Sequence, residues 1–183
     1  MLIAKEKRKE NIAEYILYLW QLEDLLRTLS LDEARIKAVL VDPATMPDDK
    51  KEQTFYWYMG IVSLLKDEGK EANGHTNHSI HLIKDLNDIH LYLLNRKKDE
   101  KYAMLYYKAK PDLELFKEKM GNSQLSDIEA AFHALYSRIL LKLKREPISA
   151  ETEEAFTNIS RLIAYLSAKF HRYEKGEEEM DEL

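Results

Sequence analysis

Cysteine is absent from this chain of 183 residues, and glycine and proline are scarce, with five and four copies. The lack of cysteine excludes disulfides, thiolate metal sites and cysteine nucleophiles. Few glycines and prolines leave few breaks, which favours long helices with short loops over a fold rich in turns. No apolar run approaches the roughly 20 residues of a membrane span, and we identify no signal peptide. We therefore expect a cytoplasmic protein that does not enter a membrane.

A basic excess is also missing. The net charge is −5, and residues 174–183 (EKGEEEMDEL) carry all of it. The rest of the chain is therefore neutral and offers no electrostatic attraction for nucleic acid. We expect residues 1–173 to form a single helical domain, and residues 174–183 to be a disordered acidic tail.

The sequence predicts an all-α fold of about seven helices in one irregular bundle. Its centre is expected at Asn11–Leu29 (NIAEYILYLWQLEDLLRTL), which is apolar nearly all round at about 100° per residue. Ser126 and Ser149 are expected to begin the last two helices. The connection between these two helices is only four residues long, which predicts a C-terminal antiparallel hairpin. Pro111 falls inside the preceding helical pattern and should kink or split that helix.

Four blocks resemble one bacterial family catalogued as a domain of unknown function. They are KRKENIAEYILYLWQLEDLLR, then GH followed by IKDLNDIHLYLL, then DIEAAFHALYSRILLKLK, then ISRLIAYLSAKF. The resemblance covers nearly the whole chain and implies an all-helical cytoplasmic protein. It implies no activity, so no catalytic residues are carried over from the family.

Candidate ligand-binding residues lie on the apolar helices. His90 shares an arc with Leu86 and Leu93 and should be buried, where a satisfied core histidine and a functional one are both open interpretations. Glu23 faces the apolar side of the central helix and needs a partner, such as Arg27 or a tyrosine hydroxyl. With Glu14 they could line a ligand site inside the bundle.

A metal site is a further candidate. His78, His81 and Asp85 lie within about 60° of one another on one helix, and two imidazoles with a carboxylate can bind a divalent ion. A solvated patch is the alternative, and we predict no cofactor. His75 is interpreted as a cap or turn residue, and His171 as a surface residue.

Aromatic residues suggest an interface. Trp20, Tyr56 and Tyr107 fall outside the main apolar seams and are interpreted as exposed anchors, although irregular core packing would also explain them. Our first hypothesis is a non-enzymatic interaction protein that self-associates or binds a protein partner. The alternative is a ligand- or metal-binding bundle, possibly an enzyme, that uses His90 or the His78/His81/Asp85 patch.

Overall fold

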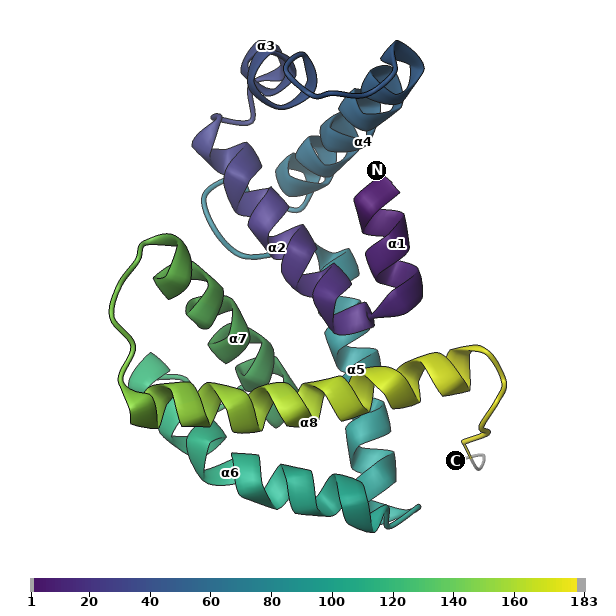
Figure 1. Cartoon of the computed structure of the whole chain (residues 1–183), viewed down its shortest axis with the longest axis vertical. Coiled ribbons are helices and arrows are strands. Elements are labelled where there is room, and N and C mark those ends of the chain that lie inside the picture. Colours follow the sequence, from purple (N-terminus) through teal and green to yellow (C-terminus); the bar gives the residue numbers. More distant parts are fainter. Residues whose placement is uncertain (1, 181–183) are drawn as a thin grey trace. The chain divides into compact units, whose positions relative to one another are not determined.

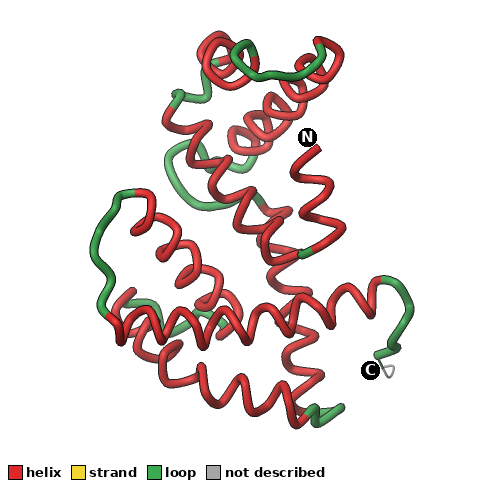
Figure 2. Tube along the Cα trace, viewed as in Figure 1, coloured by secondary structure: helices red, strands yellow, loops and turns green. Residues whose placement is uncertain are grey.

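The computed structural model describes residues 2–180, in which helices alternate with loops and turns and no strand occurs (Figures 1 and 2). The helices are α1 (Leu2–Glu10), α2 (Ile12–Thr28), α3 (Glu33–Ile36), α4 (Asp48–Asp67), α5 (Asn77–Asn95), α6 (Glu100–Met120), α7 (Asp127–Leu143) and α8 (Ala150–Glu174), with a π-helical segment, η1 (Lys37–Val41), after α3. The predicted all-α fold is confirmed. The helix that the sequence did not predict is α1, which Asn11 separates from α2.

The chain divides into two compact units. The first comprises residues 1–10 and 14–81, and the second comprises residues 11–13 and 82–183. One boundary therefore falls inside α2 and another inside α5. The prediction that residues 1–173 form one domain stays a prediction.

In the first unit, α2 supplies the core. Leu19, Leu22 and Leu26 of α2 belong to one buried cluster with residues of α3 and α4, among them Ile36 and Leu65. Apolar burial of this kind contributes about 1.5–3 kcal/mol for each large side chain. Packing inside this unit thus explains the apolar surface of α2 around Leu19, Leu22 and Leu26.

In the second unit, α6, α7 and α8 pack against one another. Their first turns are capped by Asp99, Ser126 and Ser149, whose side chains accept hydrogen bonds from the backbone N–H groups three residues on. Each cap satisfies a donor that a helix start otherwise leaves unpaired. The predicted starts at Ser126 and Ser149 are therefore confirmed.

Pro111 does not split its helix. The α6 helix continues as α-helix from Glu100 to Met120, with Pro111 inside it. Proline lacks an N–H group, but Pro111 is exposed, and water can hydrogen-bond to the carbonyl that loses its partner. Of the two expected outcomes, a kink or a split, the split is therefore wrong.

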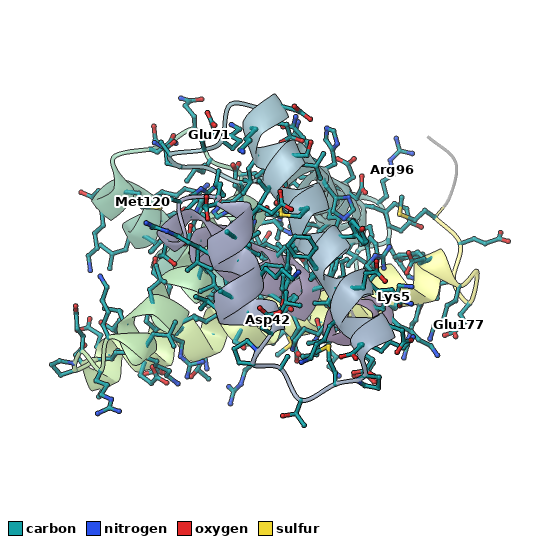
Figure 3. The ribbon with its side chains drawn as sticks, turned by 90° about the horizontal axis from the view of Figure 1, so that it is seen from above. Lys5, Asp42, Glu71, Arg96, Met120 and Glu177 are labelled. Atoms are coloured by element: carbon teal, nitrogen blue, oxygen red, sulfur yellow. The ribbon has the colours of Figure 1, made fainter. Side chains whose placement is uncertain are left out.

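The start of the acidic tail, which is part of the second unit, contacts other residues of that unit. Glu178 forms ion pairs with Lys97, Lys169 and Arg172 at 2.6, 3.0 and 3.0 Å. These hydrogen bonds lower the pKa of Glu178 to about 2. Figure 3 labels Glu177 in the same segment. Residues 181–183 lie outside the described residues, and the disorder expected of the tail stays a prediction.

Across the described residues, each helix is too short or too polar to cross a membrane.

Candidate functional site

His90 is buried in the second unit but has a polar partner. It lies on α5 with 4% of its surface exposed, and its Nδ1 atom lies 2.7 Å from the hydroxyl of Tyr102 on α6. Among the described residues, this hydroxyl has no other hydrogen-bond partner. A buried hydroxyl hydrogen without an acceptor is costly, so the Tyr102 O–H donates to Nδ1. This assignment places the imidazole proton on Nε2.

A hollow of about 460 Å³ lies beside His90. His90 lines this hollow, and every buried side-chain nitrogen or oxygen of the described residues has a hydrogen-bond partner. Nε2 of His90 has no hydrogen-bond partner among these residues, so it is not a buried atom, and we infer that it faces the hollow. Burial lowers the pKa of His90 to about 4, although the nearby Asp127 carboxylate acts in the opposite direction. The imidazole is therefore neutral at pH 7.

A second polar network forms another wall of the hollow. The Tyr106 hydroxyl on α6 donates to Oδ2 of Asp127 at 2.6 Å, and the Lys117 ammonium donates to Oδ1. Burial alone would raise the pKa of Asp127, but the hydrogen bonds from Lys117 and Tyr106 outweigh it and lower the pKa. The His90 ring contacts Tyr106 edge to face, with 4.9 Å between the centroids, so the two networks are adjacent.

Apolar side chains and a lysine complete the hollow. Leu91 and Tyr107 line it with 46% and 65% of their surfaces exposed, and Lys110 lies on the same helix as Tyr107. The ammonium of Lys110 lies 6.0 Å from the centroid of the Tyr106 ring. The arrangement combines fixed hydrogen-bond donors with exposed apolar surface, which are the two components of a recognition site.

Residues 1–177 match the family model described as Domain of unknown function (DUF4924). The chain belongs to this family. No curated protein and no solved structure matches it. Membership confirms the resemblance found in the sequence, whereas the bacterial origin stays a prediction. The family description assigns no chemistry, so the site of this DUF4924 chain has to be argued from its own residues.

Glu14 and Glu23, the two acids predicted to join His90, have their partners within the first unit. Glu14 is exposed and forms an ion pair with Lys7 at 2.8 Å. Glu23 is 1% exposed, and its carboxylate accepts hydrogen bonds from the backbone N–H and hydroxyl of Thr76. Its second oxygen lies 2.8 Å from Nδ1 of His75. Glu23 therefore holds the connection that precedes α5.

Arg27, the partner suggested for Glu23, serves a neighbouring part of the same connection. Its guanidinium forms an ion pair with Asp24 at 2.7 Å and donates to the backbone carbonyls of Lys70 and Gly74. Two charged residues of α2 thus fix the segment between α4 and α5. This arrangement favours a structural role for Glu23.

Trp20 is not an exposed anchor. It is 0% exposed, its indole N–H donates to the hydroxyl of Ser79 at 3.1 Å, and its ring stacks on His75 with centroids 3.8 Å apart. The predicted exposure of Trp20 is wrong, because the ring of His75, which lies outside α2, covers the Trp20 side chain. Tyr56 and Tyr107 are exposed as predicted, each at 65%.

The metal candidates do not assemble into a site. His78 contacts the Tyr15 hydroxyl at 3.1 Å, and His81 and Asp85 are exposed. Within residues 2–180, no group of three or more His, Asp or Glu side chains is arranged to hold a metal ion. The spacing on α5 gave three neighbouring side chains, but no other helix adds a ligand.

Sequence reasoning missed most partners of His90. Tyr102 and Tyr106 are one helical turn apart on α6, and no spacing within that helix links them to a histidine on α5. Asp127 was visible only as an acid in the first turn of α7. His171 was also misplaced, because it is buried and its Nε2 atom accepts a hydrogen bond from the backbone N–H of Ile12.

Proposed function

We propose that this chain is a non-enzymatic binding protein that recognises a protein partner at the hollow around His90. The observation that carries the proposal is a buried, neutral His90 whose Nε2–H group opens onto a hollow bordered by the exposed Leu91 and Tyr107. A buried histidine that only filled the core would not need to leave a donor open to the outside.

Exposed apolar and aromatic side chains beside a fixed donor suit a protein surface. Tyrosine is enriched at protein interfaces, where its ring can be buried while its hydroxyl stays in contact with water. Leu91 and Tyr107 extend the contact beyond the hollow itself, so a flat partner surface can cover them while one partner side chain enters the hollow. Recognition of nucleic acid is not part of the proposal, because the chain outside its acidic tail is neutral.

The ionisation of the site favours binding over acid–base catalysis. A general base works best with a pKa near the working pH, and the pKa of His90 is lowered to about 4. Asp127 is ionised and already accepts hydrogen bonds from Tyr106 and Lys117. Both groups therefore hold fixed positions at pH 7 and are suited to orient a bound group rather than to exchange protons with it.

The partner can be another protein or a second copy of this chain, and we place the encounter in the cytoplasm. The absence of cysteine supports this compartment. The prediction of self-association from the sequence is thus one form of the proposed function.

Photo-crosslinking in the native cells tests the proposal. Tyr107 is replaced by benzoylphenylalanine, and Leu143, which is 69% exposed on α7, receives the same replacement as a control. We expect a discrete adduct at position 107 and none at position 143, with mass spectrometry identifying a second copy or another protein. The adduct should decrease when His90→Gln is combined with the replacement at Tyr107. Cooperative thermal unfolding of this double variant shows that it is still folded. Equal labelling at both positions, or none at 107, would contradict the proposal.

A further inference from the structure

The lining of the His90 hollow has an excess of positive charge. Two lysines, Lys110 and Lys117, and one acid, Asp127, line the hollow, while His90 is neutral at pH 7. No other described residue that lines the hollow has a charged side chain. The lining therefore has one more positive than negative side chain, and Glu114, which pairs with Lys110 at 3.8 Å, is not part of it.

The walls of the hollow also offer several hydrogen-bond donors. The Nε2–H of His90 opens onto the hollow, and the Tyr107 hydroxyl and the amides of Asn87 and Asn95 add donors to its lining. The acceptor oxygens of Asp127 are already bonded to Tyr106 and Lys117. An occupant that brings acceptors and one negative charge would complement such walls.

We propose that the hollow binds one carboxylate, presented by an Asp or Glu side chain of the partner protein. This inference rests on the proposed function and specifies which group of the partner enters the site. The carboxylate accepts hydrogen bonds from Nε2–H of His90 and from the ammonium of Lys110. Leu91 and Tyr107 cover the apolar stem of that side chain and the partner surface around it.

A single carboxylate fits better than a phosphate. The excess positive charge of the lining is one, and a phosphate dianion would leave a net negative charge next to Asp127. Lys110 is the more available of the two ammonium groups, because its ion pair with Glu114 is long, at 3.8 Å, whereas Lys117 is bound directly to Asp127. The binding energy should therefore depend on Lys110.

The test uses two small probes and the full-length chain. Phenylacetate carries a carboxylate next to an aromatic ring, and phenylacetamide is its neutral isostere. Both are titrated into ¹⁵N-labelled protein, and the dissociation constants are measured from the shifts of backbone amides in α5 and α6. Lys110→Gln removes the proposed cation, and Lys108→Gln is the matched control, because Lys108 is exposed on the same helix and does not line the hollow.

We expect saturable binding of phenylacetate at the hollow, and binding of phenylacetamide that is weaker by roughly tenfold. Lys110→Gln should weaken phenylacetate binding by a similar factor, and Lys108→Gln should leave it unchanged. Equal affinity for the two probes, an unchanged constant in Lys110→Gln, or no binding of either probe would overturn the carboxylate assignment. Crosslinking at Tyr107 would still succeed in each of these cases if the hollow binds a partner through another group, so the two proposals fail separately.

Discussion

His90 illustrates how one buried side chain can be both structural and available for recognition. Its Nδ1 atom is fixed by Tyr102, and its ring contacts Tyr106. Its Nε2–H group remains open to the hollow. Glu23 is the contrasting case, because its two carboxylate oxygens bond to Thr76 and His75 inside its own unit. The same degree of burial therefore supports a binding role for one residue and a structural role for the other.

The lowered pKa of His90 predicts a pH-dependent stability. The ordinary pKa of histidine is 6.5, and burial lowers that of His90 to about 4. Between these values the unfolded chain binds a proton that the folded chain does not, so the free energy of unfolding falls as the pH drops from 6.5 towards 4. The full loss is about 3 kcal/mol, and the contribution is complete above pH 6.5.

Urea unfolding at a series of pH values between 4 and 7.5 measures this effect. His90→Gln should flatten the pH dependence, because the titrating group is gone. His81→Gln is the control, since His81 is exposed, and it should follow the wild-type curve. A His90→Gln chain with the same pH slope as the wild type would show that His90 is not the group responsible.

At the scale of an element, α6 shows how tertiary structure overrides a local rule. Pro111 was expected to kink or split the helix, yet α6 continues as α-helix past it, because Tyr102, Ala109 and Leu113 are buried on one side of the helix. The packing of this face offsets the missing hydrogen bond. By contrast, Ser126 and Ser149 obey their local rule, because a cap needs only the next three residues.

Replacing Pro111 by alanine should stabilise the protein. Alanine restores the backbone N–H group and removes the clash of the proline ring with the preceding turn, which costs about 3 kcal/mol in an unadapted helix. We expect a gain of roughly 1–3 kcal/mol by urea unfolding. Lys108→Ala, an exposed change on the same helix, should stay within about 0.5 kcal/mol of the wild type. A loss of stability in Pro111→Ala would mean that the proline ring itself contributes packing.

At the scale of the whole molecule, the chain forms two compact units whose boundaries fall within helices. The prediction of a single domain requires that these units unfold together. The two tryptophans, Trp20 and Trp57, belong to the first unit, whereas helices occur in each of the two units. Tryptophan emission therefore reports on the first unit alone, and far-ultraviolet circular dichroism reports on both units.

A core mutation in the second unit distinguishes one domain from two. Phe132 is 0% exposed on α7, and Phe132→Ala should cost about 3–5 kcal/mol. If the chain is one domain, both signals shift together to lower urea concentration and their midpoints coincide. Leu143→Ala, at an exposed position of the same helix, should move neither signal. A tryptophan transition that does not move in Phe132→Ala would contradict the single-domain prediction.

Patterns in the sequence predicted the all-α fold, the starts of the last two helices, the burial of His90 and the family, but not α1. These features depend on patterns within one helix, such as the spacing of apolar residues and the identity of a cap. Only the tertiary structure decided which helices share a core, that His75 covers Trp20, and that Tyr102 and Asp127 surround His90. Such partners come from segments distant in the chain, and no spacing within a helix encodes which of them will meet.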